Sequence, residues 1–115
     1  MTRLSRSDME SLWSQLDKSQ ENFSRLVLIF QQQLIDLGRA LAHMDLERLQ
    51  IESHRIRSTA VALGASELQE ILSEIERASS CRDVESIKEM RQRCEEEMVE
   101  VMAELDIFLV EKRAA

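Results

Sequence analysis

The sequence predicts an all-α domain: an antiparallel up-down-up-down four-helix bundle with a short N-terminal lid helix. The chain has no proline, only two glycines and 3% aromatic residues. Leucine, glutamate and arginine are abundant and favour helices, whereas strands are rich in aromatic and β-branched residues. Apolar residues recur at alternating steps of three and four, which is typical of amphipathic helices. The length of 115 residues suits one domain spanning 1–115.

The charge and cysteine content exclude several classes of function. A net charge of -7 argues against binding to nucleic acid or to anionic membranes, because both need a basic surface. No apolar run is long enough to span a bilayer, and the N-terminus has no signal-peptide core. Cys81 and Cys94 lack metal-ligand spacing, so we expect reduced thiols. These features predict a cytoplasmic monomer that has no nucleic-acid or membrane partner.

The first two helices are expected to cover about 7–16 and 21–43. Ser7 and Glu10 fit a capping box at the start of the first helix. Trp13 lies on the apolar side of this short helix and is expected to anchor it against the bundle. His43 falls near the end of the second helix, where a protonated ring would offset the negative end of the helix dipole.

The remaining helices are expected at about 46–63, 66–78 and 83–110. Asp45 suits the N-cap of the third helix, and Gly64 suits the left-handed position that follows its end. Ser66 and Gln69 form a second capping-box pattern, which predicts the start of the fourth helix. In the last helix, the three consecutive glutamates Glu95–Glu97 are expected to be solvated.

His54 is the residue around which the functional hypothesis is built. It lies one position past Ser53, which belongs to the buried seam of the third helix. One residue turns a helix by about 100°, so His54 should face solvent or a partner. The seam consists of Leu46, Leu49, Ser53, Ile56, Ala60 and Leu63.

The sequence offers little other catalytic chemistry. It has no glycine-rich phosphate loop, no metal-ligand cluster and no Ser-His-Asp arrangement. A neutral imidazole, which predominates at pH 7, can accept a phosphoryl group as a covalent nucleophile. Arg57, one turn along, would favour the neutral ring and then pair with the phosphoryl oxygens. Ser58 is small enough to leave room for a donor, and its hydroxyl could donate a hydrogen bond.

The residues around His54 are candidates for docking a partner. Ile51 and Val61 are apolar residues on the exposed face of the third helix, and Gln50 stands one turn before His54. Exposed apolar residues near a reactive group indicate protein docking. Arg55 follows His54 directly but points about 100° away, so its contribution should be smaller. A purely structural bundle, in which His54 is only a surface residue, is the alternative.

The segment S-H-R-I-R-S-T-A-V-A-L-G-A-S-E-L, followed by E-I-E, resembles the signature of histidine-containing phosphotransfer (HPt) domains. Arg57 stands where the family usually has lysine, Ser58 where it has glycine, and Ser53 where it has alanine. The added side chain of Ser58 lies at the expected docking surface. The matching positions are His54, Ile56, Arg57, Ser58, Thr59, Leu63, Gly64, Ala65, Leu68, Ile75 and Glu76.

This resemblance implies a phosphorelay carrier in a two-component system. His54 Nε2 would attack the phosphoryl group of a receiver-domain aspartate, Arg57 would stabilise the transferred charge, and a second receiver would collect it. The expected partners are response-regulator receiver domains and a hybrid sensor histidine kinase. The Mg²⁺ would be bound by the receiver, so the chain would need no cofactor, no metal and no ATP site of its own. It would be a phosphoryl carrier rather than a stand-alone enzyme.

Two other functions fit the same residues. The bundle could bind a receiver and sequester it without carrying phosphate, which Ser58 leaves open. The run S-H-R-I-R-S-T also resembles the phospho-acceptor box of histidine-kinase dimerisation regions. That box usually has proline where this chain has Ala60, and it is followed by an ATP-binding domain. A stable dimer in solution would favour that reading.

Overall fold

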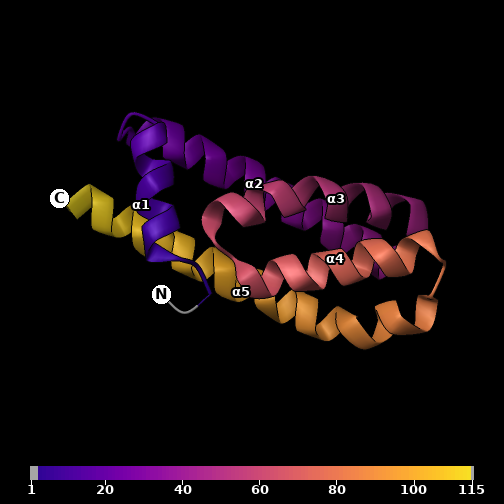
Figure 1. Ribbon diagram of the computed structural model, residues 1–115. Coiled ribbons are helices and arrows are strands. Elements are labelled where there is room, and N and C mark those ends of the chain that lie inside the picture. Colours follow the sequence, from indigo (N-terminus) through magenta and orange to yellow (C-terminus); the bar gives the residue numbers. More distant parts are fainter. Residues whose placement is uncertain (1–2, 115) are drawn as a thin grey trace.

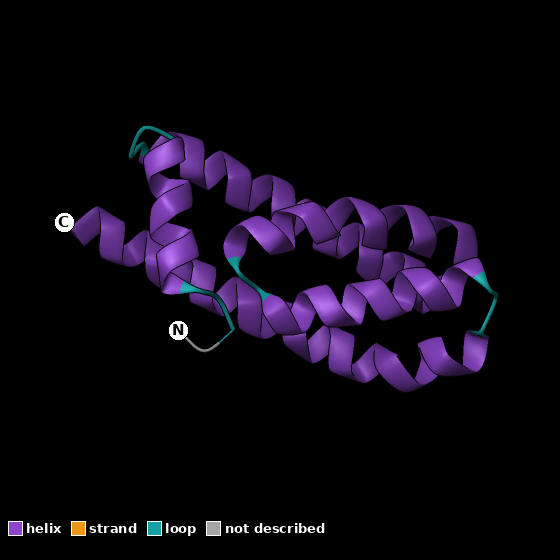
Figure 2. Cartoon of the chain, viewed as in Figure 1, coloured by secondary structure: helices purple, strands orange, loops and turns teal. Residues whose placement is uncertain are grey.

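The computed structural model describes residues 3–114, and their regular secondary structure is entirely α-helical (Figure 2). This confirms the all-α class predicted from the sequence. None of the described helices is long and apolar enough to cross a membrane. The helices are α1 (Arg6–Gln15), α2 (Gln20–His43), α3 (Leu46–Leu63), α4 (Ser66–Ser80) and α5 (Val84–Ala114).

The four longer helices pack as a closed ring. In this ring α3 contacts α2 and α4, and α5 contacts α4 and α2. The ring is elongated, with extents of 46 × 22 × 18 Å, and α1 lies across one end, where it contacts α3 (Figure 1). The α3·α4 pair and the α5·α2 pair are therefore opposite edges of the bundle. This separation matters for the surfaces described below.

Two of the predicted helix caps are correct and two are wrong. The Asp45 carboxylate accepts a hydrogen bond from the Arg48 N–H at 3.1 Å, as expected for an N-cap. At the start of α1, however, the N-cap is Ser5 rather than Ser7, and its hydroxyl accepts from the Asp8 N–H at 3.2 Å. Both serines stand three residues before an acidic residue, so the pattern fits either one.

The turn between α3 and α4 contains the other two predicted caps. Gly64 ends α3 with φ 69°, which confirms the left-handed position. Ser66 is the first residue of α4 rather than its N-cap, since Ala65 occupies the cap and makes no side-chain hydrogen bond. Ala65 is fully buried, so packing positions this helix start. The two-residue turn holds α3 and α4 close together.

Replacing Gly64 with alanine should destabilise the protein by about 1–2 kcal/mol or more. A side chain in the left-handed region is strained, and the added Cβ would also collide with the Asp8 carboxylate and with Ser5. Urea denaturation measures this loss. Gly38→Ala is the matched control, because Gly38 lies inside α2 with nothing within 4 Å of an added Cβ. It should stabilise the helix by about 0.5–1 kcal/mol. Equal effects of the two substitutions would contradict this account.

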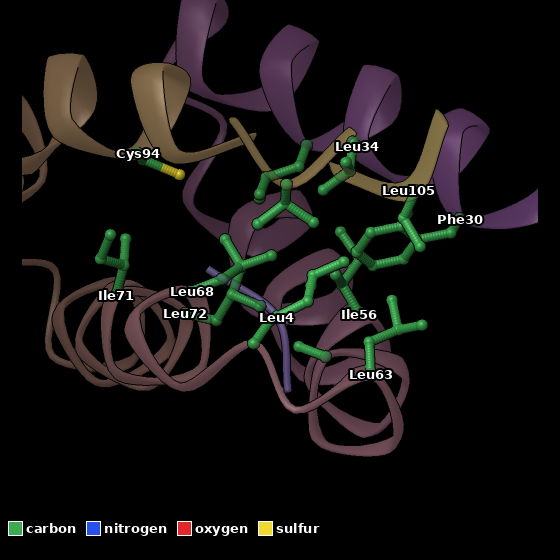
Figure 3. Packing of buried hydrophobic residues seen from close by; sticks show 14 of the residues in the cluster. Leu4, Phe30, Leu34, Ile56, Leu63, Leu68, Ile71, Leu72, Cys94 and Leu105 are labelled. Atoms are coloured by element: carbon green, nitrogen blue, oxygen red, sulfur yellow. The ribbon is translucent and has the colours of Figure 1, made fainter. Parts of the chain in front are cut away.

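The core runs the length of the ring and ends in an aromatic cluster beneath α1. Figure 3 shows the aliphatic part, to which α2, α3, α4 and α5 all contribute. At the α1 end, the Trp13 ring lies 5.8 Å from that of Phe23 and 6.2 Å from that of Phe108. Both pairs have the edge-to-face geometry that aromatic rings favour. The predicted anchoring role of Trp13 is thus confirmed.

The first described residues are bound to α5. The backbone N–H groups of Arg3 and Leu4 donate to the Glu104 carboxylate at 2.9–3.1 Å. The Arg3 guanidinium lies 3.1 Å from the Glu97 carboxylate. Glu97 is buried, so the prediction that Glu95–Glu97 is a solvated run is wrong at this residue. Burial raises the pKa of the Glu97 carboxyl, and the charge of Arg3 opposes that shift.

α5 also extends beyond the predicted end near residue 110 to Ala114.

The two cysteines should differ sharply in reactivity. Cys81 is exposed after the end of α4, whereas Cys94 lies in the core. Burial raises the pKa of the Cys94 thiol to about 12. Because the thiolate is the reactive form, we expect a thiol reagent at pH 8 to modify one cysteine in the folded protein and two in denaturant. Cys81→Ser should remove the fast reaction. Rapid native labelling of that variant would contradict the buried position of Cys94.

Candidate functional site

The exposed face of α3 presents His54 to solvent. The neighbouring Ser53 is fully buried, and its hydroxyl donates to the Leu49 carbonyl at 2.5 Å. One residue further round the helix, the His54 side chain is 71% exposed. The expectation that His54 lies outside the buried seam is therefore confirmed.

Glu76 of α4 holds the imidazole. Its carboxylate oxygens lie 3.0 and 3.2 Å from His54 Nδ1, and its side chain is only 19% exposed. A carboxylate accepts hydrogen bonds, so this contact assigns the ring proton to Nδ1. In the neutral ring, the lone pair then lies on Nε2, which is the nitrogen not engaged by Glu76.

Arg57 reaches the same carboxylate from one turn along α3. Its Nη1 lies 3.4 Å from Glu76 Oε1, and the side chain is partly exposed. Arg57 was expected to act on His54 directly as a nearby cation. The structure places the Glu76 carboxylate between the two side chains. Its negative charge therefore reduces the electrostatic effect of the Arg57 guanidinium on the His54 imidazole. His54, Arg57 and Glu76 form one polar cluster that joins α3 to α4.

Ser58 lies one turn beyond His54 and is exposed. Its hydroxyl donates to the Arg55 carbonyl at 3.2 Å, within its own helix. A hydrogen bond to a phosphoryl group would therefore require the hydroxyl to leave that carbonyl. The proposed role of Ser58 as a small neighbour stays a prediction.

The four predicted docking residues are all exposed on α3. Gln50, Ile51 and Val61 surround the His54 position, in line with their spacing on the helix. Arg55 instead lies 3.6 Å from Glu52, an almost fully buried carboxylate that also pairs with Arg48. The Arg55 guanidinium therefore lies on the side of α3 that carries Glu52, which lines a pocket with residues of α2. Contact of these residues with a partner stays a prediction.

A shallow pocket continues from Arg57 along the α3·α4 edge. It has a volume of about 620 Å³, and Arg93 of α5 lines its far side. Arg93 also forms an ion pair with Glu67. The other lining residues are Arg57 and Val61 of α3 with Ser66, Gln69, Glu70, Ser73 and Glu74 of α4. The pocket lies beside the polar cluster of His54, Arg57 and Glu76, which draws on α3 and α4, although only residues of α3 were predicted to belong to the site.

Glu76 is the residue of the candidate site that sequence reasoning missed. It matches the HPt-like pattern but was given no role. A usable signal was present, since Gln69, Ser73 and Glu76 follow each other at steps of four and three. Such spacing places them along one stripe of α4, beside the inward residues Leu72 and Ile75. No three His, Cys, Asp or Glu side chains within residues 3–114 are grouped to hold a metal ion.

Comparisons with known proteins address the fold. No protein-family model matches the chain, and no curated protein matches it either. Among solved structures, the chain is similar to the crystal structure of histidine-containing phosphotransfer protein B (HptB) from Pseudomonas aeruginosa PAO1. The TM-score is 0.74, and the match covers 98% of this chain and 96% of that chain at 20% sequence identity.

The chain has the HPt fold. The resemblance stated from residues 53–76 is confirmed at this level, and it extends over nearly the full length. At 20% identity the likeness does not assign roles to individual residues. The roles of His54, Arg57 and Glu76 therefore rest on the geometry described above.

Proposed function

We propose that the protein is a phosphorelay intermediate that carries a phosphoryl group on His54. The observation that supports this most directly is the exposed imidazole held through Nδ1 by Glu76. That contact leaves Nε2 as the nucleophile. The HPt fold and the HPt-like pattern around His54 agree with the proposal.

The proposed transfer reaction uses this geometry. The Nε2 lone pair attacks the phosphorus of a receiver's aspartyl phosphate, forming an N–P bond. The P–O bond to the aspartate breaks, and the carboxylate leaves with the electron pair. Positive charge then develops on the imidazole ring, and the Glu76 carboxylate at Nδ1 stabilises it. The reverse reaction delivers the group to a second receiver. The receiver would supply the Mg²⁺ that neutralises the phosphoryl oxygens.

The setting of this reaction is also proposed. The protein would act as a cytoplasmic monomer of a two-component system, with an up-down-up-down bundle as its scaffold. Response-regulator receiver domains, including one attached to a hybrid sensor histidine kinase, would dock around His54. The exposed Ile51 and Val61 would contribute apolar contacts there, and the exposed Gln50 would lie one turn before His54. Arg57 would pair with the transferred phosphoryl group.

The test is phosphotransfer from receiver domains of the source organism. Each purified receiver is phosphorylated on aspartate and mixed with the protein, and phosphate on the protein is followed by gel and mass spectrometry. A phosphohistidine is acid-labile and alkali-stable, whereas an aspartyl phosphate is alkali-labile. Acid-labile, alkali-stable phosphate on this protein is the expected result. Its absence with every receiver would overturn the proposal.

A sequestering module is the second candidate, because Ile51 and Val61 would serve docking equally well without transfer. It predicts a complex with a receiver and no phosphate on this protein. The histidine-kinase dimerisation fragment predicts a stable dimer in sedimentation experiments. A plain structural bundle predicts neither binding nor phosphate. The same receiver panel therefore separates the candidates.

Replacing Glu76 with glutamine should slow phosphotransfer by about 10- to 100-fold. Glutamine can still accept a hydrogen bond from Nδ1 but has no charge to stabilise the ring. A charge-assisted hydrogen bond contributes roughly 1.5–3 kcal/mol, and 1.4 kcal/mol is tenfold in rate. The measurement is the single-turnover transfer rate, together with ¹⁵N NMR of the imidazole to report its tautomer.

Glu74→Gln is the control for this experiment. Glu74 lies on the same helix and is exposed, but it pairs with Arg77 rather than with His54. Its variant should transfer phosphate at the wild-type rate. Because Glu76 acts through His54, it is a positioning residue, and the NMR spectrum should move only for Glu76→Gln. An unchanged transfer rate in that variant would contradict the assigned role.

A further inference from the structure

The exposed apolar side chains are unevenly distributed. Among the described residues, Ile51 and Val61 lie near His54, and all of the others are on α2 and α5. Single exposed apolar residues are ordinary, whereas a continuous apolar surface marks an interaction site. The exposed large apolar residues of these two helices are Leu28, Ile29, Ile35, Val99, Ile107 and Val110.

Some of these residues line a groove between α2 and α5. The groove has a volume of about 540 Å³, with Ile35 on one wall and Val99 on the other. Val99 is 68% exposed. Leu28 precedes Ile35 by two helical turns and Val110 follows Val99 by three, so each lies on the groove side of its helix, with the polar Gln31 and Asp106 between them. The groove is lined by Gln31, Leu34, Ile35, Glu95, Met98, Val99, Met102, Ala103 and Asp106.

Acidic but not basic side chains line this groove. Its ionisable lining residues are Glu95 and Asp106, and no lysine, arginine or histidine lines it. Glu95 is paired at 2.8 Å with Arg91 of its own helix. The Asp106 side chain makes no hydrogen bond or ion pair among residues 3–114. The pocket beside His54, in contrast, is lined by the arginines Arg57 and Arg93 together with the glutamates Glu70 and Glu74. The ionisable residues that line the α2·α5 groove are therefore all acidic, which favours a basic partner there, whereas the other pocket carries charges of both signs.

We propose that the α2·α5 groove binds an amphipathic helix of a partner protein. The helix would place an apolar stripe between Ile35 and Val99 and lysine or arginine side chains beside Glu95 and Asp106. A second copy of this chain fits poorly, because a two-fold pairing would bring these carboxylates together. An anionic membrane is disfavoured for the same reason.

This surface is distinct from the phosphotransfer site. The α5·α2 edge lies opposite the α3·α4 edge that carries His54 and Glu76. A partner helix in the groove would leave the imidazole uncovered. The protein could then be held in place by one partner while His54 reacts with another. The inference rests on the groove and does not depend on the proposed chemistry of His54.

The test uses a labelled synthetic helix of about 18 residues, or five turns. It carries leucines at positions i, i+3, i+4 and i+7, flanked by lysines, and a matched peptide has glutamates in place of the lysines. Fluorescence anisotropy should detect binding of the lysine peptide and much weaker binding of the glutamate peptide. Val99→Ser and Ile35→Ser should each weaken binding about tenfold or more. Ile29→Ser is the control, since Ile29 is exposed on α2 but does not line the groove.

A charge reversal gives an independent check. The double substitution Glu95→Lys and Asp106→Lys should invert the preference, so that the glutamate peptide binds better. Equal binding of both peptides to the wild type would overturn the inference. So would groove variants that bind like the wild type, or competition of the peptide with phosphotransfer at His54. Self-association abolished by Val99→Ser would assign the groove to a second copy, and vesicle binding lost in that variant would assign it to a membrane. Either result would overturn the helix proposal.

Discussion

Replacing His54 with glutamine should abolish acid-labile phosphorylation of the protein by any phosphorylated receiver. Glutamine has no nucleophilic nitrogen that could form an N–P bond. The fold should survive, because the His54 side chain is 71% exposed and surface substitutions usually change stability by less than about 0.5 kcal/mol. Phosphotransfer and urea denaturation should both be measured on the same preparation. Loss of phosphate with unchanged stability is the expected result.

His43→Gln is the matched control. His43 is the other histidine of the chain and is also exposed, at the last position of α2. It lines a pocket with Arg39 and Arg48 between α2 and α3, rather than the α3·α4 edge. The control variant should take up phosphate like the wild type. Phosphate on the His54→Gln variant, or its loss in the control alone, would contradict the assignment of His54.

Replacing Phe108 with alanine should lower the free energy of unfolding by about 3–5 kcal/mol. Phe108 is fully buried, and its ring lies 5.1 Å from Phe23 and 6.2 Å from Trp13. The substitution would leave a cavity beneath α1. It would also remove the ring over which Arg6 and Lys112 lie at 5.2 and 5.1 Å. Since the aromatic cluster joins α1, α2 and α5, this decrease in the free energy of unfolding should be among the largest for a single substitution.

Denaturation followed by Trp13 fluorescence and by circular dichroism measures this effect. Trp13 lies in the affected cluster, so its emission reports local loosening as well as unfolding. Ile107→Ala is the control, because Ile107 is adjacent but exposed, and its loss should cost less than about 0.5 kcal/mol. A cost below about 1 kcal/mol for Phe108→Ala would show that the cluster does not anchor α1.

The sequence predicted the features that depend on local periodicity. The buried residues of α3 recur with the period of an α-helix, so Ser53 could be assigned to the core and His54 to the surface. Gly64 could be placed because few other residues tolerate a left-handed backbone.

The parts that the sequence did not predict depend on contacts between distant segments. The pairing of Glu76 with His54 needs the rotation of α4 relative to α3, which periodicity does not define. Glu97 looks like part of a solvated acidic run, but the N-terminal segment covers it and Arg3 pairs with it. The N-cap of α1 was misplaced because Ser5 and Ser7 offer the same local chemistry. Each case was decided by tertiary packing.

The attachment of the first residues to α5 bears on the order of folding. Arg3 and Glu104 are separated by nearly the whole chain, so joining them closes a long loop at an entropic cost. His54 and Glu76 are only 22 residues apart, across a tight turn. We expect the α3·α4 hairpin to form early and the contact between Arg3 and Glu104 to form last. His54 would then acquire its carboxylate partner Glu76 before the rest of the bundle is complete.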